Sequence, residues 1–192
     1  QTLEGQPAFV HCGPFANIAH GNNSVVADRV ALKLADYVVT ESGFASDMGM
    51  EKFMDIVCRL GNIRPDAVVL VATVKALKHH AGDPDGGLDA IETGAANMLR
   101  HIGIVREFGI NPVVAVNRFP DDSDESVELV KKLALAGGAY GCEVNDGFSN
   151  GGAGAAALAE IVTAAADEKT DFDFIYPLDA TIEDKIDAIA KR

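Results

Sequence analysis

The feature that most constrains this chain is a run of seven small or branched residues, Ala67 to Thr73, that stays apolar up to its closing threonine. The run is too short for a typical helix and lacks the polar alternation of a strand with one solvated face. It is typical of a central strand buried on both sides in a parallel sheet. Cationic side chains follow at once, namely Lys75, Lys78, His79 and His80. Because open α/β sheets bind ligands beyond the carboxyl ends of their strands, we expect an anion near this edge.

Composition excludes several classes of partner. A formal net charge of −13 argues against nucleic acid, because binding a phosphate backbone needs a cationic face. No apolar run reaches the roughly 18 residues needed to span a bilayer, so we expect no membrane contact. The three cysteines are odd in number and lack metal-type spacing, which indicates a reducing intracellular compartment.

Two features of the chain ends suggest a part excised from a longer polypeptide. The first residue is Gln1 rather than Met, and the last predicted helix is still running at Arg192. We therefore expect residues 1–192 to form a single α/β domain of a larger protein.

Short apolar segments alternate with helical patterns along the chain. The expected strands are Ala8 to His11, Tyr37 to Thr40, Ala67 to Thr73, Val113 to Val116, Tyr140 to Val144 and Phe172 to Tyr176. The expected helices are Val25 to Ala35, Met50 to Leu60, Leu88 to Phe108, one following the capping residues Asp121 to Asp124, one ending near Ala166, and one opened by Thr181 and Asp184. This alternation predicts an α/β fold, with a mostly parallel sheet flanked by helices in a Rossmann-like, three-layer arrangement.

Five segments with unusual side chains follow expected strands. They are Phe15-Ala16-Asn17, Glu41 to Phe44, Lys75 to His80, Asn117 to Pro120 and Asp146 to Gly154. If the strands are parallel, all five segments face one rim of the sheet, which makes that rim the candidate site.

Each charged candidate has a functional and a structural interpretation. Glu41 ends an apolar run, where an acidic residue can hold Mg²⁺ or its water shell; it can also be a solvated turn carboxylate or a cap. Lys75 can neutralise phosphate oxygens, or lie on the surface of a first helical turn. The pair His79 and His80 has no nearby third ligand, which favours hydrogen-bonded loop histidines over a metal site.

Two loops carry the remaining signals. Phe119 and Pro120 either pack against a flat heterocycle or form a hydrophobic staple for the next helix. The glycine-rich loop around Phe148 either binds an anion through its backbone N–H groups or makes a tight turn. No GxxxxGK[ST] phosphate loop occurs in the chain, so half the cradle of any bound nucleotide would lie outside it.

Several blocks carry a family likeness, in order along the chain. They read PAFVHCGPFANIAHGNNS, ADYVVTESGFASDMGMEKFMDIVCR, VATVKALKHHAG and VVAVNRFPDD. These blocks closely resemble formate–tetrahydrofolate ligase, also called 10-formyltetrahydrofolate synthetase, and the likeness covers essentially the whole chain.

The resemblance implies a phosphate-loop NTPase-like fold and an enzyme that uses ATP and Mg²⁺ to activate formate as formyl phosphate. The formyl group then passes to tetrahydrofolate, giving 10-formyltetrahydrofolate, ADP and phosphate. Such enzymes are cytoplasmic homotetramers activated by a monovalent cation, K⁺ or NH₄⁺. Their phosphate loop precedes the matched blocks, so this chain alone is expected to be inactive.

The resemblance also assigns residues. Ala16, Gly43 and Phe44 match positions lining the nucleotide or folate pocket, and we place Asn17 and Lys75 with them as nucleotide-binding candidates. Phe119 and Pro120 match the edge that holds the pterin.

Five matched positions depart from the family. Cys12 occupies a position where glycine is usual, and Asn22 one where cysteine is usual. Phe148 falls where the family usually has tryptophan, the other side of the pterin stack. Lys75 stands for the signature arginine and Ala81 for a signature glycine. A non-catalytic binding or assembly module with the same fold remains an alternative, as does a related phosphate-loop enzyme such as a carboxylate–amine ligase.

Overall fold

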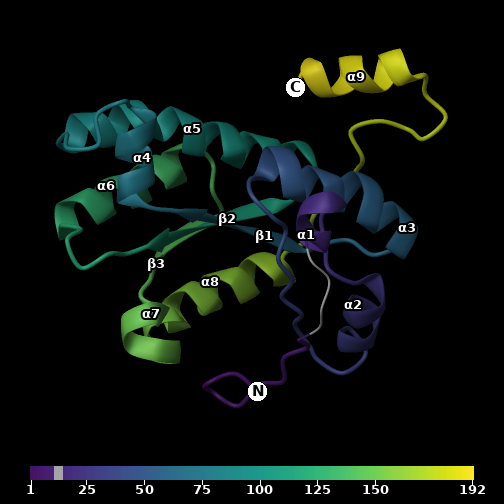
Figure 1. Cartoon of the computed structure of the whole chain (residues 1–192), viewed down its shortest axis with the longest axis horizontal. Helices are drawn as coiled ribbons and strands as arrows, with labels where there is room; N and C mark the ends of the chain where they lie inside the picture. The colour runs from purple at the N-terminus through teal and green to yellow at the C-terminus, as the bar shows by residue number, and fades with distance from the viewer. Residues whose placement is uncertain (11–14) are drawn as a thin grey trace. The chain divides into compact units, whose positions relative to one another are not determined.

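The computed structural model describes residues 1–10 and 15–192, which fall into two compact units (Figure 1). One unit is Asp66–Thr170, and the other combines Gln1–Pro65 with Asp171–Arg192. The single domain expected over residues 1–192 stays a prediction. The sheet lies wholly within the first of these units.

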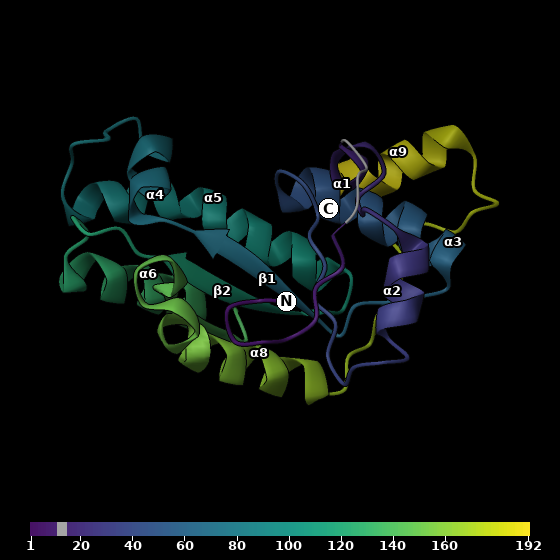
Figure 2. The ribbon, with the colours of Figure 1, turned by 60° about the horizontal axis from the view of Figure 1, so that its bottom comes forward.

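The unit of residues 66–170 is built on a parallel three-stranded sheet with the order β1-β2-β3. Its elements in chain order are β1 (Ala67–Ala72), α4 (Val74–His80), α5 (Leu88–Glu107), β2 (Asn111–Asn117), α6 (Asp124–Ala136), β3 (Gly141–Asn145), α7 (Gly147–Asn150), η3 (Gly151–Ala155) and α8 (Ala156–Asp167). Helices α5 and α6 lie on one face of the sheet and α8 on the other (Figures 1 and 2). This arrangement confirms the α/β class with parallel strands flanked by helices in three layers.

Strand β2 is the centre of this sheet. Its residues Val113, Val114 and Val116 are fully buried, because helices cover both faces and a strand pairs on each side. A buried parallel strand needs apolar side chains in both directions, which is why its sequence reads as an uninterrupted apolar run.

Strand β1 corrects the first expectation drawn from the sequence. Among the described strands it lies at an edge of the sheet, and Val69 and Val71 keep 40% and 65% of their surface exposed. The prediction that residues 67–73 form a central strand buried on both faces is therefore wrong within this sheet. An apolar run indicates that its residues favour a strand, but it does not specify how many other strands pair with that strand.

Side-chain caps and apolar spacing explain the helices. Thr73 Oγ1 accepts the Ala76 N–H over 2.9 Å, so the chain passes from β1 into α4 with one intervening residue. Ser123 Oγ accepts the Ser126 N–H over 3.2 Å at the start of α6. In α5, the side chains that recur at helical spacing pack into the core: Ile91, Ala95, Met98, Ile102 and Val105.

The other unit is largely helical. Its elements are α1 (Ala16–Ala19), α2 (Val25–Ala31), η1 (Ser46–Met50), η2 (Phe53–Cys58), α3 (Arg59–Gly61) and α9 (Ile182–Ala190). Ser24 caps α2. Thr181 caps α9 by accepting the Asp184 N–H over 3.1 Å, as the sequence predicted.

Three expected strands are not formed as strands in the described part of this unit. Tyr37 to Thr40 and Phe172 to Tyr176 have no strand pairing, and Val39 is 91% exposed. Residues 8–10 are also irregular, and His11 lies outside the described residues. Strand preference depends on a neighbouring strand, and these segments have none among the described strands.

The segment from Phe172 to Tyr176 is held instead by one arginine. The Arg59 guanidinium lies 3.8 Å from the centre of the Phe174 ring, and its Nη2 donates to the Tyr176 carbonyl oxygen over 2.6 Å. Asp55 accepts from the same Nη2 over 3.3 Å. The aromatic residues Phe174 and Tyr176, whose composition predicted a strand, therefore pack against the Arg59 guanidinium.

Across the described residues, we find no helix with both the length and the apolar character needed to cross a membrane.

Two glycines of α5 provide a test of the packing of α4 on α5. A Cβ at Gly94 would lie 1.8 Å from the Leu77 carbonyl oxygen, whereas a Cβ at Gly103 would meet nothing within 4 Å. Gly94→Ala should lower the free energy of unfolding by about 1–3 kcal/mol through overpacking. Gly103→Ala should raise it by about 0.5–1 kcal/mol, because alanine loses less backbone entropy in a helix. Urea unfolding followed by circular dichroism measures both; equal stability of the two variants would contradict this packing.

Candidate functional site

The candidate site lies at the carboxyl ends of the three parallel strands. Asn117, the last residue of β2, is in register with Asn145, the last residue of β3. The loops that follow these strands therefore start side by side, and α4 follows β1 at the same edge. The structure thus brings together three of the five segments expected at the rim.

Internal hydrogen bonds hold the loop after β2 in place. The Phe119 N–H donates to Asp122 Oδ2 over 2.9 Å, and the Asp122 N–H donates back to the Phe119 carbonyl oxygen over 3.0 Å. Arg118 Nη2 donates to Asp124 Oδ1 over 2.6 Å. The Phe119 ring is 46% exposed, so this ordered loop presents an aromatic face to solvent.

The staple interpretation of Phe119 does not fit this loop. A hydrophobic staple uses the residue just before the helix cap. The cap of α6 is Ser123, and the residue before it is Asp122. Phe119 and Pro120 lie further upstream and are both exposed, which leaves the ring available for a ligand.

The loop after β3 presents a second aromatic face. Phe148 lies on α7 and its side chain is fully exposed. The loop closes through the Asp146 N–H, which donates to the Gly154 carbonyl oxygen over 2.9 Å. A Cβ at Gly154 would lie 2.3 Å from the Asp146 carbonyl oxygen, so this close approach requires glycine. The glycines of this loop thus serve its tight turn, and the turn holds Phe148 outward.

Lys75 lies at the same rim, in the first turn of α4, and is exposed. Ala81 is the C-terminal cap of the same helix and occupies the position of a family glycine. Its φ is −71°. This is an ordinary right-handed conformation, so the substitution of alanine for glycine causes no backbone strain there.

Glu41, Gly43 and Phe44 belong to the other unit. Gly43 is buried against Gly49 of η1, where a Cβ would lie 1.9 Å from the Gly43 carbonyl oxygen. Phe44 has φ +67° and is 75% exposed. A bulky residue in the left-handed region is uncommon and costs energy, and such residues cluster at functional sites.

A buried asparagine, for which the sequence predicted no structural role, holds this segment. Asn22, 1% exposed, donates through Nδ2 to Thr40 Oγ1 over 3.0 Å and accepts the Ser24 N–H through Oδ1 over 2.7 Å. Ser42 Oγ donates to the Gly21 carbonyl oxygen over 3.0 Å. Only its place in a loop rich in glycine and asparagine hinted at this role, since its partner is 18 residues away.

The remaining candidates are placed only in part. The backbone of Ala16 and Asn17 lies in α1, and their side chains are outside the described residues. Glu41 is exposed, and among the described residues no group of three or more His, Cys, Asp and Glu side chains is arranged to hold a metal ion. The role of Glu41 as a metal ligand therefore stays a prediction. A metal ion bound there would take its remaining ligands from a bound phosphate and from water.

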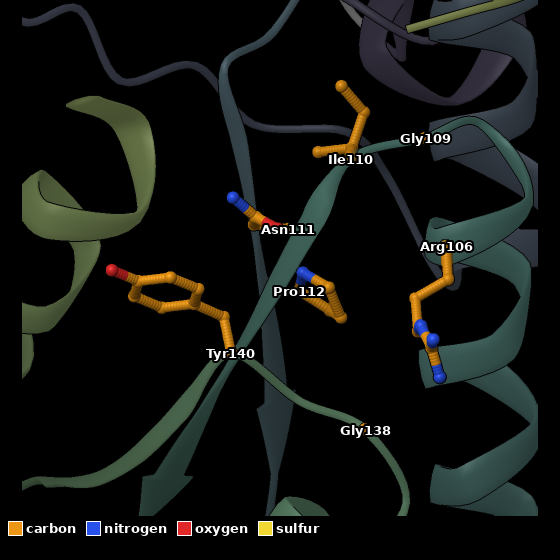
Figure 3. Close-up of a pocket in the computed structure, with 7 residues that line it drawn as sticks. All are labelled: Arg106, Gly109, Ile110, Asn111, Pro112, Gly138 and Tyr140. Atoms are coloured by element: carbon orange, nitrogen blue, oxygen red, sulfur yellow. The ribbon is translucent and has the colours of Figure 1, made fainter. Parts of the chain in front are cut away.

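A hollow of about 320 Å³ lies at the opposite edge of the sheet (Figure 3). It is lined by Arg106, Gly109, Ile110, Asn111, Pro112, Gly138 and Tyr140. The Arg106 and Tyr140 side chains lie on different sides of Pro112 and do not point toward each other. Because no polar groups converge there, the hollow is a weaker candidate than the rim.

The two described cysteines are structural. Burial raises the pKa of Cys58 and of Cys142 to about 12, and for Cys58 the neighbouring carboxylates of Asp55 and Asp28 add to the rise. A thiol in this state is protonated at neutral pH and is a poor nucleophile.

This pKa shift predicts slow alkylation. Both thiols should resist iodoacetamide at pH 8 in the folded protein, since roughly one molecule in 10⁴ would carry the thiolate. Because the pKa is raised, reactivity should grow only as the pH approaches 12 or when urea exposes the thiols. Peptide mapping by mass spectrometry identifies each labelled cysteine; rapid labelling of either one in the folded protein at pH 8 would show that its burial is wrong.

The family model described as formate–tetrahydrofolate ligase matches residues 1–192. Proteins named formate–tetrahydrofolate ligase from Desulforamulus reducens, Dehalococcoides mccartyi and Haloquadratum walsbyi are 50%, 49% and 48% identical to the chain. These matches cover 100%, 100% and 99% of the chain and 36%, 34% and 35% of the respective relatives. The chain thus spans about a third of the length of the curated relatives it matches.

Proposed function

We propose, from the premise that this chain belongs to the formate–tetrahydrofolate ligase family, that its rim supplies the folate contacts and part of the nucleotide contacts of such a ligase. The reaction would be the ATP-dependent ligation of formate to tetrahydrofolate, giving 10-formyltetrahydrofolate, ADP and phosphate through formyl phosphate. Family membership supports this enzyme over a phosphate-loop relative with other substrates.

The observation that carries the proposal is the pair of exposed aromatic rings at the ends of adjacent strands. Phe119 and Phe148 belong to ordered loops that start side by side, and neither ring is covered by the core. Aromatic side chains stack on flat heterocycles, and an exposed pair on a rigid edge suits the pterin ring of tetrahydrofolate. Pro120, next to Phe119, adds a rigid edge to this surface.

The nucleotide part of the proposal rests on charge and on backbone conformation. Lys75 would act as a point charge for phosphate oxygens. Gly43 and Phe44 would contact the nucleotide with Ala16 and Asn17, and Glu41 would hold Mg²⁺ through its oxygen atoms. The left-handed conformation of Phe44 supports a binding role for that segment.

Other properties of the proposed enzyme follow from family membership alone. We propose activation by a monovalent cation, K⁺ or NH₄⁺, a cytoplasmic location and a homotetrameric assembly of the complete protein. A non-catalytic binding or assembly module remains the second candidate, because Phe148 and Lys75 differ from the residues usual in the family.

Alanine substitution of either ring tests the folate surface. Phe119→Ala and Phe148→Ala, made in the intact protein, should each weaken tetrahydrofolate binding by about 5- to 150-fold, since stacking of a flat base on an aromatic ring contributes roughly 1–3 kcal/mol. ATP binding should stay unchanged. Phe148→Trp should bind folate more tightly, because the indole offers a larger stacking face.

Leu135→Ala is the matched control for these variants. Leu135 is 50% exposed in the last turn of α6, so its removal also deletes exposed apolar surface but leaves the rim intact. Isothermal titration with tetrahydrofolate and with ATP gives both affinities. If the two phenylalanine variants bound folate as tightly as Leu135→Ala, the rim would not be the folate surface.

Residues 1–192 as an isolated chain should not catalyse the reaction. No lysine in this stretch belongs to a phosphate loop, so the cradle for the transferred phosphoryl group would be incomplete. Incubation with MgATP, formate and tetrahydrofolate, followed by absorbance of the folate product, should show no turnover. Formation of 10-formyltetrahydrofolate would contradict the proposal that residues 1–192 lack part of the phosphate-binding site.

A further inference from the structure

A pair of asparagines closes the parallel pairing of β2 and β3 at the rim. Asn117 and Asn145 are direct partners in register, and Asn145 Nδ2 donates to Asn117 Oδ1 over 2.7 Å. The pair before them, Val116 and Val144, is apolar. The side chains therefore change from apolar packing to a polar bridge at the point where the two strands end.

The bridge is connected to both loops that carry the aromatic rings. Asn145 Oδ1 accepts the Gly147 N–H over 3.2 Å, one residue before Phe148. The Asn145 carbonyl oxygen accepts the Arg118 N–H over 3.3 Å, one residue before Phe119. Asn145 thus contacts the residue preceding each ring.

We propose that Asn117 and Asn145 form a positioning pair that holds the loops of Phe119 and Phe148 in place, and so positions both rings for a pterin. This inference rests on the proposed folate function. Neither asparagine needs to touch the substrate. Their effect passes through the two loops, whose starting points the bridge holds at one separation.

A purely structural role for the bridge is the competing explanation. The backbone ladder already joins the strands from Val113 and Gly141 to their ends, and the interior of β2 is fully buried. A neutral side-chain hydrogen bond adds only about 1 kcal/mol to such a scaffold. The bridge joins the last pair of residues before both loops begin. A small movement of this pair would therefore displace the loops and leave the packing of the core unchanged.

Alanine variants in the intact protein separate these explanations. Asn117→Ala removes the bridge, and Asn145→Ala removes the bridge together with the Gly147 contact. Asn117→Ala should raise the dissociation constant for tetrahydrofolate about five- to tenfold, as loss of one ordering hydrogen bond implies, and Asn145→Ala should raise it at least as much because it also loses the Gly147 bond. The dissociation constant for ATP should change less than about twofold, since the bridge belongs to the folate loops. In turnover, the Michaelis constant for folate should rise with little change in kcat.

Asn111→Ala is the matched control. Asn111 lies at the other end of β2, where its Nδ2 donates to the Ala165 carbonyl oxygen over 3.3 Å. Asn111→Ala removes one hydrogen bond donated by a side-chain amide of the same strand. The variant should therefore be less stable but should bind folate with unchanged affinity. Asn117→Asp is the conservative variant, because it keeps an acceptor for Asn145 Nδ2 and should bind folate nearly as well as the unmodified protein.

The double variant tests the coupling. If the two side chains act through one bridge, Asn117→Ala combined with Asn145→Ala should bind folate about as weakly as Asn145→Ala alone. Additive losses, a loss in Asn117→Asp as large as in Asn117→Ala, or an equal loss in Asn111→Ala would each overturn the positioning role.

The same titrations distinguish failure of the inference from failure of the proposed function. If the unmodified protein did not bind tetrahydrofolate, or if Phe119→Ala bound it equally well, the folate function itself would fall. If those controls behave as expected but the asparagine variants match Asn111→Ala, only the positioning pair is wrong.

Discussion

The parallel register between β2 and β3 is the constraint on which the rest of the structure depends. It places Val116 opposite Val144 and Asn117 opposite Asn145, so two loops that start 28 residues apart in the chain leave the sheet together. A slip of one residue would move every side chain of β2 to the opposite face of the sheet and would separate Asn117 from Asn145. The position of the aromatic rings therefore follows from this register.

In the unit of residues 66–170, the core provides a rigid scaffold and the rim carries the candidate binding residues. Apolar side chains from the sheet and from α4, α5 and α6 form the rigid core, and the loops at the strand ends carry the exposed rings. Binding residues on loops held by a rigid scaffold are a common arrangement, because such loops can be ordered without being buried. Here the hydrogen bonds around Phe119 and the glycine contact at Gly154 supply the order.

The sequence predicted the parts of the fold that depend on local pattern. Strands β2 and β3, the long helix α5 and the caps at Ser123 and Thr181 follow from apolar spacing and capping chemistry. Tyr37 to Thr40 has the composition of a strand but forms none, because that outcome depends on a neighbour that local composition does not specify. The edge position of β1, the buried contact from Asn22 to Thr40 and the bridge at Asn117 likewise depend on partners distant in the chain. Among the site candidates, Phe119, Phe148 and Lys75 meet at one rim, whereas nothing in a single sequence specifies the hydrogen bonds that hold them.

The central claim is that a pterin ring lies between the two exposed aromatic faces at the ends of β2 and β3. The most direct measurement is a crystal structure of the intact protein with bound tetrahydrofolate. The account predicts electron density for the pterin stacked between Phe119 and Phe148, with Pro120 along its edge. Density for the pterin against other residues, with both rings left uncovered, would contradict it.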